Sequence, residues 1–411
     1  MGSFSTPLSA LNADTTAIDV VGNNLANLNT PGFKASTVSF EDLVTESIGA
    51  GLGSTQVGFG VGTPITLRQF TQGALQSTGG PLDAAIQGNG FFIVNDNGNT
   101  EYTRGGNFQV NTDGDLETAS GQLVQGWTMT DGVVDTNQPI GNITVPVGTL
   151  TAPVATQNVS VSLNLDSAAA SGTSFSTSVQ VYDSLGQAHT LTFTFTQSGT
   201  PNQWNYSVSV PNADVSSGTF TPVTGTLTFD SNGNLTSPAA GAPVAIPITG
   251  LADGASDMNI SWSLYNGSSP DITQYDQSSA ASAQSQDGSA AANLVSVGLA
   301  NGGQVLAQYS NGTQVVVGQM AMAEIRNPDS LIAVGNSNYQ ASALTALPAV
   351  GLPGTGGRGT VVGGSVEAST VNIATEFTNM IVFQQSYEAN AHMVTTIDQL
   401  SQTTLNLQNE Q

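Results

Sequence analysis

Helix-forming patterns occur only at the two ends of this chain. From Leu11 the apolar residues recur at three- or four-residue spacing until Pro31-Gly32 ends the pattern, which predicts an N-terminal helix with one narrow apolar stripe. At the other end, residues 369–408 contain neither glycine nor proline, and a helix of that length would extend about 60 Å. Because one helix cannot bury such a stripe alone, the two ends are predicted to pair as a coiled coil.

The apolar stripes give candidate contact residues for this pairing and for assembly. On the N-terminal helix they are Leu11, Ile18, Val21, Leu25 and Leu28. On the C-terminal helix they are Ile373, Phe377, Met380, Tyr387, Asn390, Ala391, Val394, Leu400 and Leu407. A solvent-exposed coiled coil normally carries charged residues beside the stripe, but here the flanks are Asn, Gln, Thr, Ser and Ala. Uncharged flanks favour packing against further copies of the same helices; a helical hairpin within a monomer is the alternative.

Between the helices the sequence indicates β-structure throughout. Asn-Gly and Asp-Gly pairs, which are strong hairpin signals, occur ten times between residues 89 and 312. Two shifts in composition, at residues 146–170 and 268–292, bracket a stretch without Lys or Arg. We therefore predict a mainly β, multidomain chain. It would contain two or more barrel-like or sandwich-like domains, one inserted into the other.

This interpretation divides the chain into five parts. Residues 1–30 form the N-terminal helix of an inner core, 31–70 a linker or extended segment, 71–145 and 271–358 one discontinuous β-domain, 146–270 an inserted outer β-domain, and 359–411 a Gly-rich connector and the C-terminal core helix.

Charge excludes several classes of partner. The chain has five Lys and Arg against 29 Asp and Glu, for a net charge of −24, so it repels nucleic acid and anionic lipid.

The sequence also limits the chemistry and the location of the chain. It has no cysteine, which excludes disulfides and thiolate chemistry. No run approaches the roughly 18 apolar residues of a membrane span, and we expect no membrane insertion. The N-terminus lacks the features of a cleaved signal peptide, so we expect any export to use another route.

Three motifs invite a chemical interpretation that the sequence does not favour. Asp183, Ser184 and His189 lie within seven residues, but a catalytic triad needs pre-positioned partners, and DSLGQ is typical of a hairpin turn. Residues 111–115 and 230–234 faintly resemble calcium loops but lack their Gly at position six and Glu at position twelve. His392 stands alone in the long helix. We therefore expect no enzyme activity, no catalytic residues, no cofactor and no metal site.

Five segments of the chain resemble the bacterial flagellar rod and hook proteins. They are LNADTTAIDVVGNNLANLNTPGFKAS (11–36), TQGALQSTGGPLDAAIQGNGFFIV (71–94), YTRGGNFQVNTDGDLETASGQLVQGW (102–127), YSNGTQVVVGQMAMAEIRNPDSLIAVGNSNY (309–339) and GSVEASTVNIATEFTNMIVFQQSYEANAHMVTTIDQLSQTTLNL (364–407). They follow the order of the family and cover well over a third of the chain. Residues 146–270 resemble the outer domain of a hook subunit, and distal-rod proteins are shorter and lack so large an insertion.

The resemblance implies a hook subunit that self-assembles into a curved helical tube and acts as a universal joint between motor and filament. Paired terminal helices would line its channel, with β-domains outside. It also implies the partners: further copies of the chain, rod proteins, a hook-capping protein, a hook–filament junction protein and the flagellar type III export apparatus. The location would be the extracellular hook of the flagellum. A distal-rod subunit is the main alternative, and a secreted β-rich adhesin or S-layer-like protein is a further one.

Within the resembling segments, several polar positions are expected to serve assembly. Asn23 and Asn29, and also Asn24 and Asn27, would form hydrogen bonds with neighbouring copies, and Gly32 with Phe33 would turn the chain from the inner wall of the tube outward. The family pattern carries basic residues where this chain has Gln385 and His392, so no basic contact is expected there.

Overall fold

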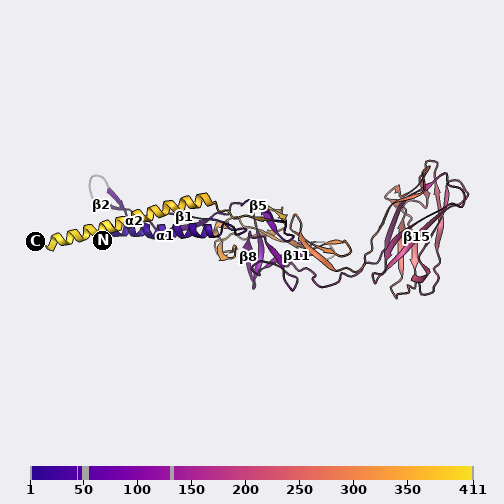
Figure 1. The fold of residues 1–411 in the computed structure, drawn as a ribbon, viewed down its shortest axis with the longest axis horizontal. Helices are drawn as coiled ribbons and strands as arrows, with labels where there is room; N and C mark the ends of the chain where they lie inside the picture. The colour runs from indigo at the N-terminus through magenta and orange to yellow at the C-terminus, as the bar shows by residue number, and fades with distance from the viewer. Residues whose placement is uncertain (1, 44, 49–54, 130–133, 410–411) are drawn as a thin grey trace. The chain divides into compact units, whose positions relative to one another are not determined.

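The computed structural model describes residues 2–43, 45–48, 55–129 and 134–409. The chain forms two compact units: the first comprises residues 1–147, 296–307 and 314–411, and the second comprises residues 148–295 and 308–313. Strands dominate, and long helices lie at the two ends of the chain (Figure 1). The prediction of a mainly β, multidomain chain with paired terminal helices is confirmed.

The two helices both belong to the first unit. Helix α1 spans Gly2–Ala26 and α2 spans Ile373–Asn409, and they lie side by side with the two chain termini at the same end (Figure 1). Helix α2 begins after Asn372, whose side-chain Oδ1 accepts the backbone N–H groups of Ala374 and Thr375 at 3.0 and 3.3 Å, as an N-cap residue does. Neither helix, over its described residues, is long and apolar enough to cross a membrane.

The first unit is built on one large sheet and several two-stranded ones. The large sheet has the order β25-β26-β27-β11-β7-β8-β30-β29, with β9, β10, β12, β28 and β31 attached to it. The small sheets are β1-β4, β2-β3, β32-β6 and β33-β5. The bounds are β1 Ser36–Ser39, β2 Thr45–Ile48, β3 Thr55–Gly58, β4 Ile65–Arg68, β5 Leu75–Ser77, β6 Ala84–Gln87, β7 Phe91–Asp96, β8 Asn99–Thr103, β9 Phe108–Val110, β10 Leu116–Thr118, β11 Leu123–Thr128, β12 Gly141–Asn142, β25 Leu294–Leu299, β26 Gln304–Tyr309, β27 Gln314–Met320, β28 Met322–Glu324, η2 Pro328–Ser330, β29 Ile332–Gly335, β30 Asn338–Gln340, β31 Ala349–Gly351, β32 Thr360–Gly363 and β33 Ser365–Glu367.

The second unit is a sandwich of two five-stranded sheets. One is the antiparallel meander β14-β15-β16-β17-β18, and the other has the order β19-β20-β13-β23, with β24 also paired to β13. The bounds are β13 Asn158–Asp166, β14 Ser174–Tyr182, β15 Ala188–Gln197, β16 Gln203–Ser209, η1 Asn212–Asp214, β17 Val223–Phe229, β18 Leu235–Ser237, β19 Val244–Ile248, β20 Met258–Ser263, β21 Tyr265–Asn266, β22 Ser269–Pro270, β23 Ile272–Tyr275 and β24 Ala280–Gln286.

Aromatic residues fill the core between these two sheets. Along β15 the buried residues alternate with partly exposed ones, as expected for strands with one face on a core. Trp262 of β20 is fully buried, and its ring centroid lies 4.9 Å from that of Phe193 and 5.3 Å from that of Tyr206. The core therefore draws on both sheets, with Trp262 at its centre.

The second unit extends beyond the sequence-based boundary at residue 270. Strand β23 runs parallel to β13, and β24 pairs with β13 antiparallel from Ala280 to Gln286, so residues 271–295 group with the outer unit. Almost every side chain of β24 is exposed. Strand β24 is held in the sheet by backbone pairing with β13 and buries almost no side chain. Its Ser, Ala and Gln residues therefore lack the alternation of apolar and polar residues that indicates a strand, and the sequence analysis placed a domain boundary there.

Candidate assembly site

The contact face of α1 consists mainly of small side chains. Ala13, Ala17 and Val21 are buried at four-residue spacing, with Asp14 and Asn24 on the same face. Small residues allow two helix axes to approach closely. On α2 the inward positions are less covered: Glu376 is buried, while Met380, Phe383, Asn390, Ala391, Val394 and Ile397 are half-buried.

Two polar contacts set the register of the pair. The Asn24 side-chain amide donates to Glu376 Oε1 at 3.1 Å, and the Asn390 amide donates to Asp14 Oδ2 at 3.0 Å. Asn24 lies near the end of α1 whereas Glu376 lies near the start of α2, so the helices are antiparallel. Polar residues in an otherwise apolar seam favour one register over its slipped alternatives.

The buried carboxyl of Glu376 predicts an unusual dependence on pH. Burial raises the pKa of Glu376, and the hydrogen bond from Asn24 offsets only part of that rise. Between the ordinary pKa and the raised one, the folded state binds more protons than the unfolded state, so the contribution of Glu376 to stability falls as pH rises through this window. We expect Glu376→Gln to remove this fall and to match or exceed the natural chain in stability at pH 7.

Urea unfolding of the monomeric chain between pH 5 and 7, followed by helical circular dichroism, measures this slope. Glu388→Gln, at an exposed position on α2, is the matched control and should leave the slope unchanged. An identical slope in Glu376→Gln and the natural chain would contradict the prediction.

The apolar stripes predicted from the sequence coincide only in part with the buried face of each helix. Of the predicted residues on α1, Val21 is buried and Leu11, Ile18 and Leu25 are half-buried, and Leu28, just after the helix, is also half-buried. On α2, the predicted contacts Ile373, Phe377, Tyr387 and Leu400 are exposed. Met380, Asn390, Ala391 and Val394 do face inward, and the side chain of Leu407 lies outside the described residues. The larger side chains flank the seam because the Ala-rich face permits the closer helix contact.

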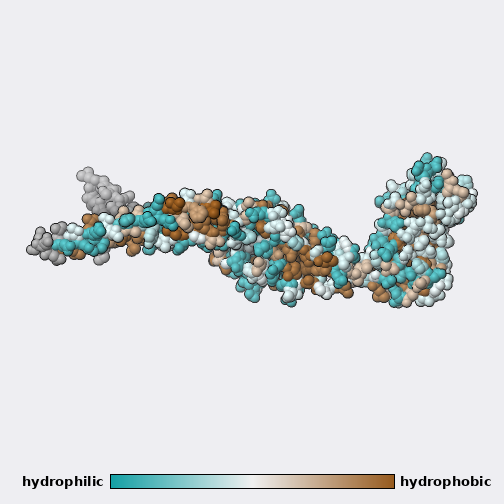
Figure 2. Space-filling view, viewed as in Figure 1, coloured by the Kyte–Doolittle hydropathy of each residue, from teal (hydrophilic) through white to brown (hydrophobic). Residues whose placement is uncertain are grey.

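The helical pair therefore leaves apolar side chains exposed, and Figure 2 shows brown gathered over the end of the pair next to the β-structure. On α2 the exposed large apolar residues are Ile373, Phe377, Ile381, Val382, Tyr387, Met393, Leu400 and Leu405, and α1 adds Phe4 and Leu8. We call this set the outer helical face. Large apolar side chains exposed in this number on one element are typical of protein–protein contact sites.

The four asparagines near the end of α1 have different environments. Asn24 is buried, and its side chain also pairs with the backbone of Ser36, donating to the carbonyl at 2.8 Å and accepting the N–H at 3.0 Å. Its amide is thus used within the chain, in contrast to the expected contact with neighbouring copies. Asn27 is half-buried and donates to the Asn23 carbonyl at 2.9 Å. Asn23 and Asn29 are exposed.

A buried ionic cluster joins the segment after α1 to the strand before α2. Lys34 Nζ lies 2.6 Å from Glu367 Oε1, and Arg104 Nη1 lies 3.2 Å from Glu367 Oε2. All three side chains are almost fully buried. Lys34 also donates to the Thr71 carbonyl at 2.7 Å, and Glu367 Oε1 accepts the Gly73 N–H at 2.7 Å. Burial lowers the pKa of Lys34, despite the opposing effect of Glu367.

Gly32 and Phe33 lie beside this cluster. Gly32 has φ +69°, and a Cβ there would lie 2.4 Å from the backbone carbon of Arg104, so no other residue fits without moving the backbone. Its N–H donates to the Glu367 carbonyl at 2.8 Å. Phe33 is half-buried and lines a cavity of about 500 Å³ together with Asn23. Gly32 thus positions the chain at the junction between the helices and the β-structure.

Asp183 and His189 flank a hairpin turn between β14 and β15, as the sequence predicts. Asp183 Oδ2 lies 3.0 Å from His189 Nε2, but Ser184 is exposed and its Oγ accepts the Ser256 backbone N–H at 3.0 Å. The serine of the apparent triad is therefore not oriented by the histidine. Two groups were missed: Asp214 Oδ2 lies 2.9 Å from His189 Nδ1, and Asp253 Oδ2 lies 4.0 Å from Nε2. They come from loops distant in sequence and carry no local signal.

The calcium-like segments also form turns. Asn111 Oδ1 accepts the backbone N–H groups of Asp113 and Asp115, and Asp230 Oδ1 accepts those of Asn232 and Asn234. These hydrogen bonds turn the side chains onto their own backbone, and the hairpin interpretation holds for both. His392 is exposed on α2.

Four family models match successive parts of the chain. They are the flagella basal body rod protein (residues 4–34), the flagellar hook protein FlgE/F/G D1 domain (85–164), the flagellar basal body protein FlaE D2 domain (149–289) and the flagellar basal body rod FlgEFG protein C-terminal region (362–407).

Full-length relatives share the same name. The flagellar hook protein FlgE of Salmonella typhimurium is 35% identical over 98% of this chain and 100% of its own length. Those of Escherichia coli and Borreliella burgdorferi are 33% and 32% identical, over 98% and 100% of this chain. The crystal structure of Helicobacter pylori hook protein FlgE2 has the same fold, with a TM-score of 0.53 at 15% identity over 70% of this chain and 99% of that one. These matches do not favour the rod alternative: the chain belongs to the flagellar hook protein FlgE family.

Proposed function

We propose that this chain is the structural subunit of a bacterial flagellar hook and that its copies assemble into a curved helical tube. The tube acts as a universal joint that transmits motor torque to the filament. The single observation that carries this proposal is the outer helical face. Its apolar residues stay exposed after α1 and α2 have paired through the Asn24–Glu376 and Asn390–Asp14 contacts. They are therefore available to pack against further copies of the chain.

The polar outer surfaces support a joint that bends. Residues 105–325 contain no Lys or Arg, and the exposed residues along β14 and β24 are mainly Ser, Thr, Ala and Gln. Neutral hydrogen bonds exchange with water more readily than charge-assisted ones. Neighbouring β-units can then slide past one another while the helices keep contact. In this role the chain performs no catalysis.

The same role implies partners and a location. Rod proteins would contact the base of the tube, a hook-capping protein its growing end, and a hook–filament junction protein its finished end. The subunits would pass through the flagellar type III export apparatus, without a cleaved signal peptide, to the extracellular hook. Within each subunit, we propose that the terminal helices form the inner core and that the β-domains lie outside it.

Polar substitutions on the outer helical face test the proposal. Phe377 and Ile381 are 51% and 54% exposed and lie one helical turn apart. Because each apolar side chain contributes about 1.5–3 kcal/mol when it becomes buried, we expect Phe377→Ser with Ile381→Ser to raise the critical concentration for assembly at least about tenfold. Sedimentation of polymer against total protein measures that concentration.

The control is Gln385→Ala, at an exposed polar position on the same helix, which should assemble as the natural chain does. Circular dichroism of the variants verifies that the helices persist. Electron microscopy of the natural polymer should show short curved tubes. Straight tubes would favour a rod subunit, and unchanged assembly of the double variant would show that this face is not the contact.

A further inference from the structure

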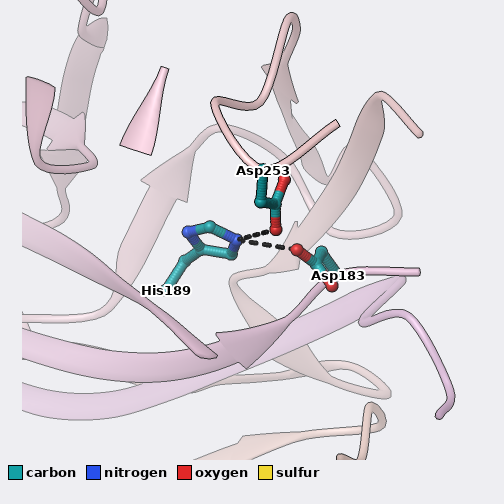
Figure 3. A group of neighbouring side chains, drawn as sticks. All are labelled: Asp183, His189 and Asp253. Carbon is teal, nitrogen blue, oxygen red and sulfur yellow. Dashed lines mark hydrogen bonds and ion pairs between the residues drawn. The ribbon is translucent and has the colours of Figure 1, made fainter. Parts of the chain in front are cut away.

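Three carboxylates from separate segments of the second unit meet around one imidazole. His189 lies on β15, Asp183 on the turn before it, Asp214 on η1 and Asp253 on the loop between β19 and β20. Figure 3 shows the carboxylates of Asp183 and Asp253 both directed at His189 Nε2, at 3.0 and 4.0 Å. Asp214 Oδ2 lies 2.9 Å from Nδ1 on the other side of the ring. Asp183, His189 and Asp253 each offer one atom that could bind a metal ion, and these three atoms lie within 4.8 Å of one another.

The hydrogen bonds of this ring cannot all be made by a neutral imidazole. Neutral histidine carries one N–H. When Asp214 accepts it at Nδ1, the lone pair of Nε2 faces the carboxylates of Asp183 and Asp253; in the other tautomer the lone pair of Nδ1 faces Asp214. A lone pair directed at carboxylate oxygens is repulsive. A cation at Nε2 makes the arrangement favourable, and a metal ion or a second proton can supply it.

The surroundings favour a cation with more than one charge. Residues 148–295 contain nine Asp and one His, with no Glu, Lys or Arg. A single proton on His189 leaves three neighbouring carboxylates opposed by one positive charge. The backbone N–H groups of Leu185 and Gln187 donate to Asp183 Oδ1 at 2.8 and 2.9 Å. They fix this side chain, and its Oδ2 points toward the ring.

We propose that His189 Nε2, Asp183 and Asp253 bind a divalent transition-metal ion of the zinc type, with Asp214 orienting the imidazole. One nitrogen with carboxylate oxygens suits zinc better than calcium, which prefers all-oxygen sites. A carboxylate on the second nitrogen of a ligating histidine is the usual outer support of zinc sites. The side chain of Asp253 is 28% exposed, which leaves access from solvent and room for a water ligand.

The ion would fasten three loops at one end of the sandwich. The turn that carries Asp183 lies close to the segments by which the chain enters and leaves the second unit. A Cβ on Gly186 would be 2.9 Å from Pro153 and 3.1 Å from the backbone nitrogen of Ala291, and Thr156 N–H donates to the Tyr182 carbonyl at 2.8 Å. Metal binding there would resist separation of η1 and the Asp253 loop from β15.

The chain offers a direct test because it contains only two histidines. Full-length monomer with ¹⁵N-labelled histidine is titrated with Zn²⁺ at pH 8, where protons compete less, in excess Mg²⁺ to occupy weak carboxylate sites. Nuclear magnetic resonance should show the Nε2 signal of His189 shifting at one equivalent, while the signals of exposed His392 stay in place. Equilibrium dialysis should give one Zn²⁺ per chain.

Variants separate a built site from adventitious binding. His189→Gln should lose the stoichiometric Zn²⁺, whereas His392→Gln should retain it. Asp253→Asn keeps the contacts of His189 with Asp183 and Asp214 and should weaken Zn²⁺ binding at least about tenfold, so the test stands even if His189→Gln does not fold. An unshifted His189 signal, or equal Zn²⁺ binding by Asp253→Asn and the natural chain, would overturn the proposal. The positive charge among the carboxylates would then come from a second proton on His189.

Discussion

Replacing Glu367 by glutamine is expected to destabilise the first unit by about 3–5 kcal/mol, since removal of one partner from a buried ion pair leaves uncompensated charge. Two cations, Lys34 and Arg104, would then remain buried against a neutral amide. Lys34→Met should have a smaller effect, because Glu367 keeps both Arg104 and the N–H of Gly73 as partners. Urea unfolding followed by helical circular dichroism at 222 nm measures both changes.

A double variant makes this expectation specific to charge. Lys34→Met combined with Glu367→Gln removes one of the unpaired cations and should recover part of the stability lost in Glu367→Gln alone. It also keeps the test informative if the single variant is recovered unfolded. Glu388→Gln, exposed on α2, should unfold like the natural chain. A double variant as unstable as the sum of the two single variants would show that the cluster is not held by its charges.

Replacing Trp262 by alanine is expected to destabilise the second unit by about 3–5 kcal/mol, the usual effect of removing a large buried aromatic side chain. Its ring packs against Phe193, Phe195 and Tyr206, with centroids 4.9 to 6.1 Å away. All proteins carry Trp127→Phe, because Trp127 lies in the core of the first unit. The indole fluorescence of Trp204, also in the core of the second unit, then reports unfolding of that unit, whereas the signal at 222 nm reports α1 and α2. We expect the fluorescence midpoint to fall by about 1 M urea or more and the helical midpoint to stay unchanged.

Two controls accompany this measurement. Trp262→Phe keeps an aromatic ring in the core and should lose less stability than the alanine variant, and Leu185→Ala, at a side chain 62% exposed, should change little. If the helical midpoint fell together with the fluorescence midpoint in Trp262→Ala, the two units would unfold as one body. The independent outer unit that the domain division implies would then be wrong.

Sequence periodicity identified the two helices but only part of the face along which they meet. Two stripes overlap on α1, one of Leu and Ile and one of Ala13, Ala17 and Val21. The Leu and Ile stripe is the more hydrophobic, so a pattern read from the sequence favours it. The Ala-rich stripe allows the two helix axes to come closer, and this closer approach determines the contact. The outcome turns on the three-dimensional fit to α2, which the sequence of α1 alone does not contain.

Long-range polar groups were beyond the reach of local patterns. The motif containing Lys34 was part of the family resemblance, but its partner Glu367 is 333 residues away, and nothing in either segment indicates the other. Asp214 and Asp253 reach His189 for the same topological reason. By contrast, hairpin turns depend on a few neighbouring residues, so the turn at residues 183–187 was predictable.

The separation between Lys34 and Glu367 also sets an order of events for a chain that emerges amino end first. The core of the second unit lies almost entirely within residues 148–295 and can form as soon as that stretch is released. The first unit must wait for Glu367 and α2, the last part of the chain to appear. Under the proposed role, a subunit in transit would carry a folded outer sandwich while its inner unit, which carries the outer helical face, was still incomplete. The inner unit would be completed only when the carboxyl end arrived, and this would delay polymerisation until the whole subunit had been released.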